Sequence, residues 1–162
     1  MTIETVRADY RNPAHAAAVV ALLNVYASDP MGGGQPLADN VCEALPPGLA
    51  NCPTAFSVLA YDADKPVGLA NCFFGYSTFA AKPLVNIHDM VVVPEARGTG
   101  VVDAMFDAIE SIAHAEGACK VTLEVLSGND RAKAVYTRRG YGDFVLDPAM
   151  GHALFWQKRL AA

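Results

Sequence analysis

Residues 91–102 read VVVPEARGTGVV, an apolar segment that runs into a short turn built around Gly98 and Gly100. The valines predict a buried strand, and the residues after Gly100 predict the start of a helix. Backbone N–H groups converge where a glycine turn opens a helix, and the helix dipole adds positive potential there. The stretch therefore predicts a corner that holds a pyrophosphate, the alternative being a strand–turn–helix corner without a ligand.

Two common phosphate-binding patterns do not match this turn. A dinucleotide-binding fold of the GxGxxG type needs a third glycine where Asp103 stands, and its turn usually lies near the start of the domain. A P-loop needs a Gly-Lys-Ser/Thr sequence, which the turn lacks. Both nucleotide-binding classes are therefore disfavoured.

Downstream of the turn, apolar residues recur at helical spacing up to Gly117, where the helix is expected to end. Alternation predicts a strand at 120–126, and a helix follows from Asn129 to Arg139, closed by Gly140. Two last strands are expected at 141–145 and 153–158.

Upstream of the turn, the pattern alternates between strands and helices. The expected elements are a strand at 3–8, a helix at 14–27 after Asn12-Pro13, a mobile loop at 31–36, a helix at 37–45, a hairpin of strands 55–61 and 67–76, and a strand at 84–93. The fold class is thus α/β (α+β), with residues 1–162 forming one domain. We expect a mixed, mostly antiparallel sheet of six or seven strands flanked by about four helices.

Composition excludes several classes of protein. The chain has 162 residues, of which 52% are hydrophobic and 18% charged, and no apolar run approaches the length of a membrane span. The net charge is −5 and the basic residues form no long run, so no nucleic-acid partner is expected. The start MTIETVRADY has no basic and apolar leader, which predicts a cytoplasmic protein. The four cysteines lack CxxC spacing, so no metal site is expected.

With these elements in place, the sequence resembles the GNAT superfamily of N-acetyltransferases. Its acetyl-CoA signature, Arg/Gln-x-x-Gly-x-Gly/Ala between a strand and a helix, is matched at Arg97 and Gly100 and departs at Val102. A second segment, Asn-x-x-Ala-x-x-x-Tyr followed by Gly-Phe/Tyr, is matched from Asn129 to Tyr136 and at 140–141. Two motifs in the right order and spacing make this resemblance specific.

Within that superfamily, the chain is most similar to the spermidine/spermine (diamine) acetyltransferase branch. The similarity lies in residues 67–70, 73–76, 86–90 and 154–156. That branch carries Glu-Asp where this chain has His88-Asp89.

The resemblance implies acetyl-CoA as cosubstrate, with no metal. Main-chain groups of Met90, Val91 and Val93 would pair with the pantetheine arm, and Asn129 would both cap its helix and touch the cosubstrate. The pyrophosphate would be wrapped by Arg97, Gly98, Thr99, Gly100, Val101 and Val102. Asp103 stands where a basic or hydroxyl residue is frequent, so weaker binding of acetyl-CoA is expected.

Three residues are candidates for chemistry. Tyr136 is expected to act as general acid toward the leaving thiolate and to touch the cosubstrate, the alternative being a core tyrosine. His88 replaces the glutamate of the branch and is expected to act as general base, the alternative being a structural histidine. Asp89 is expected to bind a cationic substrate group or to anchor its strand, on the opposite face from His88. Phe74 and Tyr76 are expected to line the acceptor pocket, the alternative being a core or dimer contact.

The sequence thus predicts transfer of an acetyl group from acetyl-CoA to a primary amine of a small molecule, either a polyamine or diamine or an amino-acid-like acceptor. Direct attack in a ternary complex is expected, because no cysteine is placed to act as nucleophile. The alternative is a non-catalytic acyl-CoA-binding or regulatory module of the same fold. A homodimer is a further expectation.

Overall fold

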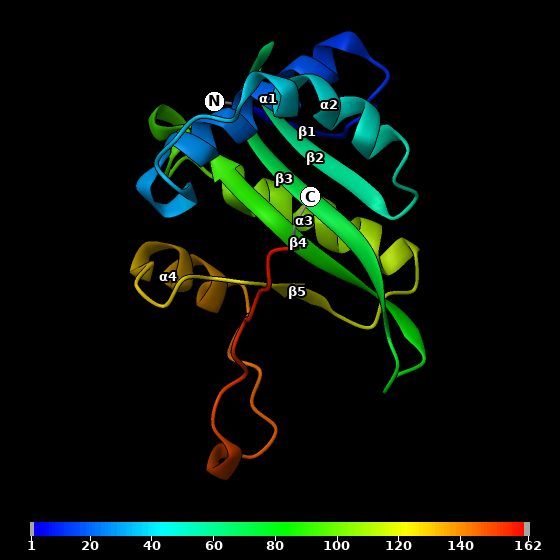
Figure 1. Cartoon of the computed structure of the whole chain (residues 1–162), viewed down its shortest axis with the longest axis vertical. Coiled ribbons are helices and arrows are strands. Elements are labelled where there is room, and N and C mark those ends of the chain that lie inside the picture. The colour runs from blue at the N-terminus through cyan, green and yellow to red at the C-terminus, as the bar shows by residue number, and fades with distance from the viewer. Residues whose placement is uncertain (1, 161–162) are drawn as a thin grey trace. The chain divides into compact units, whose positions relative to one another are not determined.

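A computed structural model describes residues 2–160, which fall into two compact units. The first unit extends to Leu123 and contains the whole sheet, and the second unit begins at Glu124. Each unit is considered by itself below (Figure 1).

The first unit is built on a five-stranded sheet with strand order β1-β2-β3-β4-β5. Neighbouring strands from β1 to β4 are antiparallel, and β4 pairs with β5 in parallel. The predicted mixed, mostly antiparallel α+β fold is confirmed, although the sheet has fewer strands than expected. The strands are β1 (Ile3–Arg7), β2 (Ala55–Asp62), β3 (Lys65–Ser77), β4 (Lys82–Val92) and β5 (Val121–Leu123).

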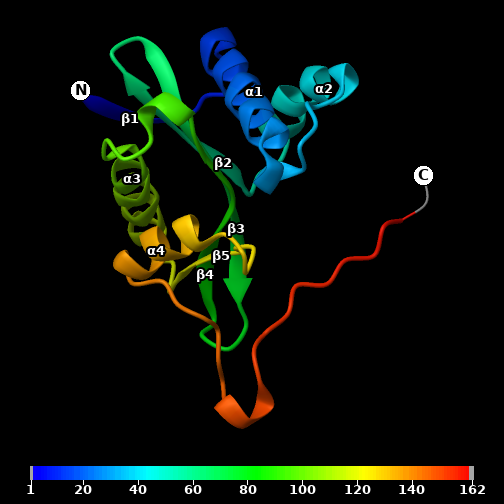
Figure 2. The ribbon, with the colours of Figure 1, turned by 90° about the vertical axis from the view of Figure 1, so that its left-hand side faces the viewer.

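Helices cover both faces of this sheet. Figure 2 shows α1 (Pro13–Ser28) and α2 (Asp39–Ala50) on one face and α3 (Val101–Ala115) on the other. The Asn12-Pro13 signal marks the start of α1 as predicted, because the Asn12 side chain accepts a hydrogen bond from the Ala14 N–H at 2.9 Å. α2 continues past the predicted end at Leu45 and includes two prolines, Pro46 and Pro47.

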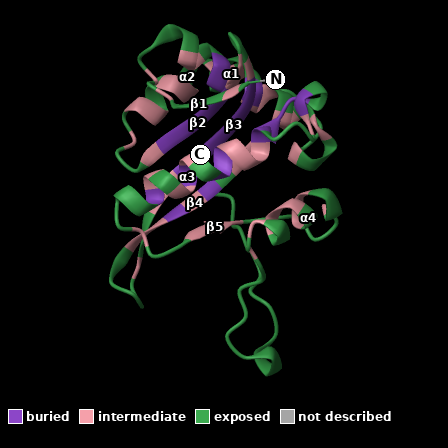
Figure 3. Cartoon of the chain, turned by 180° about the vertical axis from the view of Figure 1, so that it is seen from behind, coloured by how far each residue is buried: buried purple, intermediate pink, exposed green. Residues whose placement is uncertain are grey.

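The core lies on both faces of the sheet, where the strand centres pack with buried residues of α3 on one face and of α1 on the other (Figure 3). Met105, Phe106 and Ile109 are each 0% exposed, which confirms the helical periodicity read from the sequence. The closest approach is at Gly68 of β3. A Cβ atom there would lie 2.8 Å from Val101 Cγ1 and 2.9 Å from Met105 Sδ, so only glycine lets the first turn of α3 sit this near the strand.

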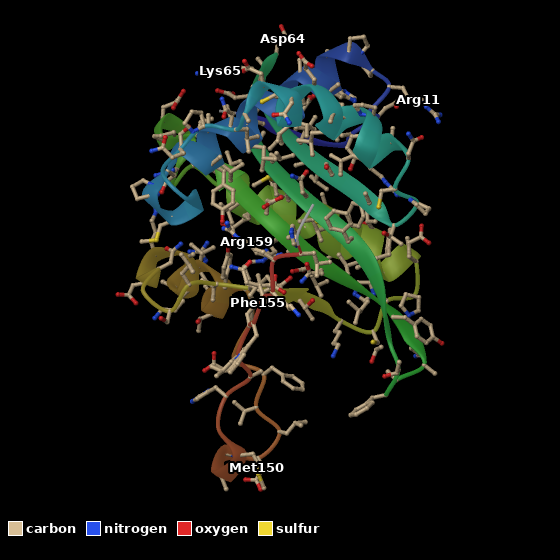
Figure 4. All side chains as sticks on the ribbon, viewed as in Figure 1. Arg11, Asp64, Lys65, Met150, Phe155 and Arg159 are labelled. Atoms are coloured by element: carbon tan, nitrogen blue, oxygen red, sulfur yellow. The ribbon has the colours of Figure 1, made fainter. Side chains whose placement is uncertain are left out.

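The second unit contains α4 (Asp130–Arg138) and a single turn of 3₁₀ helix at Pro148–Met150. The strands predicted at 141–145 and 153–158 are wrong, because the described part of this unit contains no strand. Strand propensity needs a neighbouring strand to accept the backbone hydrogen bonds, and these residues pair with none. Large apolar side chains in this segment are exposed, among them Met150 at 82% and Phe155 at 78% (Figure 4).

The close approach of β3 and α3 gives a test of the packing. Replacing Gly68 with alanine should lower the free energy of unfolding by about 1–3 kcal/mol, because Val101 or Met105 must shift. Gly48→Ala in α2 is the matched control, since a Cβ there meets nothing within 4 Å and alanine favours helix. Urea denaturation of both variants measures the difference, and equal midpoints for the Gly68 variant and the parent would contradict this packing.

Candidate functional site

The glycine turn adopts a backbone that requires its glycines. Gly98 has φ +82° and Gly100 has φ +92°, a left-handed region that disfavours side chains, and a Cβ at either residue would point into open space. Gly100 is the N-cap of α3 and offers no side-chain hydrogen bond to the first turn. The turn therefore presents exposed backbone at a helix N-terminus, which suits an anion.

Arg97 is held by the protein on two sides. Its Nε donates to the Val92 carbonyl at 3.1 Å, and its Nη2 lies 3.2 Å from Asp29 Oδ2. Asp29 also accepts a hydrogen bond from the Met31 N–H, and this bond followed by the Arg97 contact lowers the pKa of its carboxyl. Arg97 thus ties the glycine turn to the segment that follows α1.

That segment includes residues 31–36, for which the sequence predicted a mobile loop. Pro30–Gly32 form a 3₁₀ turn, and a Cβ on Gly32 would lie only 1.9 Å from the Tyr26 carbonyl oxygen. Farther on, the Gln35 N–H donates to the Ala27 carbonyl at 3.1 Å, and the Leu37 N–H donates to Asn24 Oδ1 at 2.8 Å. Hydrogen bonds therefore join this segment to the C-terminal part of α1.

In its second half, β4 pairs with no strand of the first unit on the side away from β3. β5 pairs with it only as far as Ile87, opposite Leu123. The Val93 N–H donates to the Val67 carbonyl of β3 at 3.0 Å, so alternation directs the polar backbone groups of Met90 and Val92 away from β3. The Val92 carbonyl, which accepts from Arg97, agrees with this direction. Of the predicted Met90, Val91 and Val93, only Met90 directs its backbone outward.

A bulge in β4 occurs at His88. Asn71 pairs with Asp89 and Cys72 with Ile87, which leaves His88 without a register partner. The His88 ring packs edge-on against Phe73 at a centroid distance of 5.5 Å. Phe73 and Asn71 share one face of β3, so the prediction that His88 and Asp89 point to opposite faces is wrong. The extra residue breaks the two-residue period, and both side chains reach the same face.

That face is the one covered by α1. Gly68 points toward α3, and Asn71, an odd number of residues away on the same strand, points the other way. Tyr26 of α1 is near Asp89. Burial raises the pKa of the Tyr26 phenol, and the nearby charges of Asp89 and Asp29 raise it further. Burial, with a contribution from Asp89, raises the pKa of the Cys72 thiol to about 12.

Phe74 and Tyr76 lie elsewhere. Phe74 packs against Phe56 with ring centroids 4.9 Å apart, and alternation places it on the face opposite Asn71. Both rings line an open hollow of about 430 Å³. The structure does not bring them together with His88 and Asp89. The residues around the hollow are Thr54, Phe74, Gly75, Tyr76, Pro83 and Glu116.

Asn129 and Tyr136 belong to the second unit. Asn129 Oδ1 accepts a hydrogen bond from the Ala132 N–H at 3.1 Å, which confirms its predicted role as the N-cap of α4. Tyr136 lies on α4 with its ring centroid 6.4 Å from that of Tyr141.

Several residues of the site were missed by the sequence reading. Tyr26 and Asp29 at the end of α1 carried no motif. Ser57 and Asn71 did carry a signal, since each interrupts an otherwise apolar strand. Within residues 2–160, no group of three or more potential metal ligands occurs, and no helix is long and apolar enough to cross a bilayer.

A family model described as acetyltransferase (GNAT) family matches residues 20–141. The N-acetyltransferase YhfO of Bacillus subtilis (strain 168) is 26% identical over 84 residues, covering 52% of this chain and 56% of that protein. The match thus spans little more than half of the relative's length.

Solved structures share the fold at lower identity. A crystal structure described as a probable acetyltransferase has a TM-score of 0.81 at 16% identity, with 98% of this chain and 99% of that chain covered. The aminoglycoside acetyltransferase meta-AAC0020 from an uncultured soil metagenomic sample, in complex with sisomicin, has a TM-score of 0.75 at 16% identity, with 98% and 97% covered. AAC(6')-Iy in complex with the bisubstrate analog CoA-S-monomethyl-acetylneamine has a TM-score of 0.76 at 16% identity, with 99% and 100% covered.

The glycine turn can be tested by comparing the two ends of α3. Gly100→Ala should cost about 1–2 kcal/mol of stability through left-handed strain and weaken CoA binding about tenfold, because the turn must rearrange. Gly117→Ala is the matched control, since Gly117 has φ +70° and open space at the other end of the helix. Calorimetric titration with CoA measures the affinities, and equal affinities in the two variants would remove the turn from the binding site.

Proposed function

Because this chain belongs to the acetyltransferase (GNAT) family, we propose that it moves the acetyl group of acetyl-CoA to a primary amine of a small molecule. The family match runs from residue 20 to 141 and so includes parts of both units, which supports a single acetyltransferase domain over residues 1–162. The observation that carries the proposal is the meeting of three features on β4. An open backbone edge at Met90 directly follows His88 and Asp89, beside the glycine turn.

The residues of the first unit fit acetyl-CoA. Glycines 98 and 100 leave room for a phosphate where side chains would project, and the start of α3 adds backbone N–H groups from Val101 and Val102. The side chains of Arg97 and Thr99 support the turn by binding protein groups. Thr99 Oγ1 donates to the Ala96 carbonyl at 2.7 Å, and Arg97 binds the Val92 carbonyl and Asp29. The outward backbone groups of Met90 offer strand-like hydrogen bonds to an amide-containing arm. We also propose that Asn129 contacts the cosubstrate, because it begins the segment that resembles the second motif of the family.

The acceptor nitrogen must lose a proton before it attacks. A primary ammonium has a pKa near 10.4, so reaching the neutral amine at pH 7 costs about 4–5 kcal/mol. His88 is exposed and is held edge-on by Phe73, which makes it available to take that proton. Asp89, on the same face, attracts the cationic acceptor.

Acetyl-CoA supplies an acetyl group already activated as a thioester. The amine nitrogen forms the new C–N bond directly, the C–S bond breaks, and Tyr136 donates its phenolic proton to the leaving sulfur. The nitrogen loses its second proton as the intermediate collapses, and a proton from solvent restores the Tyr136 phenol. The proton taken by His88 passes to solvent, so each turnover releases one proton in total and leaves the enzyme unchanged. No covalent acetyl-enzyme is required.

The chemical class of the amine acceptor can be identified with a panel of substrates. We propose a diamine, polyamine or amino-acid-like acceptor because Asp89 places a carboxylate beside His88. Aminoglycosides are included in the panel because structurally similar proteins carry that description.

The reaction is tested by thiol release from acetyl-CoA with polyamines, lysine analogues, aminoglycosides and peptide N-termini. Tyr136→Phe should lower kcat by about 10²-fold with little change in the KM for acetyl-CoA. His88→Ala should remove the limb of the pH–rate profile that reports the general base. CoA binding without thiol release for any amine would instead favour a non-catalytic acyl-CoA-binding module. An unchanged pH profile would place the base elsewhere.

We also propose that the protein forms a homodimer through its C-terminal segment. Among large apolar residues of the segment, Leu154 is 74% exposed and Trp156 is 83% exposed, and exposed apolar surface of this kind marks an interface. β5 ends the sheet of the first unit and offers an edge to a strand from a second copy. Each copy therefore carries both a donor segment and an acceptor edge.

Replacing Phe155 and Trp156 together with aspartate should convert the dimer to a monomer, measured by light scattering after size exclusion. Phe79→Asp is the control, since Phe79 is 98% exposed but lies outside the segment. A parent protein that is monomeric at all concentrations would contradict the proposal.

A further inference from the structure

Two polar side chains are buried among the apolar residues of the sheet. Ser57 of β2 is 0% exposed and Asn71 of β3 is 3% exposed, and no other polar or charged residue is fully buried within residues 2–160. Burying a hydroxyl or an amide costs free energy unless each group finds a hydrogen-bond partner. Their place in the sheet therefore depends on a network.

The network is a single chain of hydrogen bonds that ends on Asp89. Tyr10 Oη lies 2.8 Å from Ser57 Oγ, Ser57 Oγ donates to Asn71 Oδ1 at 2.6 Å, and Asn71 Nδ2 donates to Asp89 Oδ2 at 3.0 Å. Ser57 pairs with Asn71, and Asn71 pairs with Asp89, in the register of the three strands. The chain thus crosses β2, β3 and β4 in a straight line.

The chemistry of the groups fixes the direction of every bond. The Asn71 carbonyl oxygen only accepts, so the Ser57 hydroxyl proton is committed to it. The Tyr10 hydroxyl must then donate to Ser57 Oγ. A carboxylate only accepts, which orients the Asn71 amide nitrogen toward Asp89. All three donors therefore point toward the carboxylate, and such chains strengthen one another in a low-dielectric interior.

This series of hydrogen bonds orients the Asp89 carboxylate and does not conduct protons. Passing a proton through Asn71 would require its amide to adopt an imidic acid form, whereas donors that all point toward a carboxylate hold that carboxylate in one orientation. The start of the chain is also fixed, because the Ala8 N–H donates to the Ser57 carbonyl at 2.8 Å and the Asn12 N–H to the Asp9 carbonyl at 3.0 Å.

The carboxylate held in this way lacks a cation. Asp89 is half-buried, and within residues 2–160 no lysine, arginine or histidine forms an ion pair with it. The groups near it are the Tyr26 phenol and the Cys72 thiol, both uncharged at neutral pH since their pKa values are raised. A half-buried carboxylate with directed donors and no counter-ion is a seat for a ligand cation.

We propose that Tyr10, Ser57 and Asn71 are positioning residues that hold Asp89 as the seat for a second ammonium group of the acceptor. This inference rests on the proposed acetyl transfer and narrows its acceptor to a short diamine. One nitrogen is deprotonated by His88, and the other remains cationic against Asp89. The bulge makes the pair compatible, because it brings both side chains to one face of the sheet.

The test compares 1,4-diaminobutane with 1-aminobutane, which has the same carbon chain and lacks the second ammonium. The parent should favour the diamine in kcat/KM by about tenfold, and Asp89→Asn should abolish the preference. Ser57→Ala should reduce the preference about threefold through the KM for the diamine, with the KM for acetyl-CoA unchanged. Tyr10→Phe should act in the same direction, and its half-buried loop position makes loss of folding a small risk.

A double-mutant cycle separates positioning from a structural role. If Ser57 acts through Asp89, Ser57→Ala should have no further effect on the preference in the Asp89→Asn background. Tyr61→Phe makes the same chemical change as Tyr10→Phe on a half-buried tyrosine of β2 outside the chain, and it should leave the preference unchanged. An unaltered preference in both Ser57→Ala and Tyr10→Phe, or equal and additive losses in the two backgrounds, would overturn the positioning role.

Calorimetric titration of the parent and the variants with both amines, with and without CoA, measures the affinity of each amine without requiring turnover. If no amine is acetylated but 1,4-diaminobutane binds and is weakened about threefold by Ser57→Ala, acetyl transfer fails and the seat is upheld. If 1-aminobutane and 1,4-diaminobutane are acetylated and bound equally well by the parent, acetyl transfer is upheld and the seat is overturned.

Discussion

The contact between β3 and the first turn of α3 is the constraint on which the rest of the first unit depends. Gly68 lacks a side chain where Val101 and Met105 arrive, and both of these residues are fully buried. Because the helix is pressed onto the strand at its first turn, its N-terminus has one position relative to β4. The glycine turn that joins β4 to α3 must close over that fixed distance. Its left-handed glycines follow from this closure.

The bulge at His88 is the second constraint, and it acts on the other face of the sheet. A regular strand would send His88 and Asp89 to opposite faces, which would separate a titratable ring from a carboxylate. The extra residue in β4 brings both to the same face of the sheet as Asn71 and Phe73, while Ile87 and Val91 remain buried. The Ser57–Asn71 pair then holds the carboxylate from behind. The same strand therefore presents an imidazole, a carboxylate and the outward backbone groups of Met90 in succession.

Electrostatic ties join segments that are distant in sequence. The ion pair between Asp29 and Arg97 links the end of α1 to the glycine turn, so these two segments are held together. Arg97 is the residue that the family signature would assign to the phosphate. Its bonds to Val92 and Asp29 indicate that it shapes the turn.

The sequence by itself determined the class of fold, the order of the elements up to α4, the glycine turn and the cap at Asn129. These features depend on local periodicity, on glycine conformation and on short-range capping, all of which are written in neighbouring residues. Strand propensity at 141–145 and 153–158 misled, because a strand exists only where another strand accepts its hydrogen bonds. The face reached by His88, the placement of Phe74 and Tyr76 away from Asp89, and the chain from Tyr10 to Asp89 were decided by the tertiary structure. Each depends on register between strands, and register arises only when distant segments pack against one another.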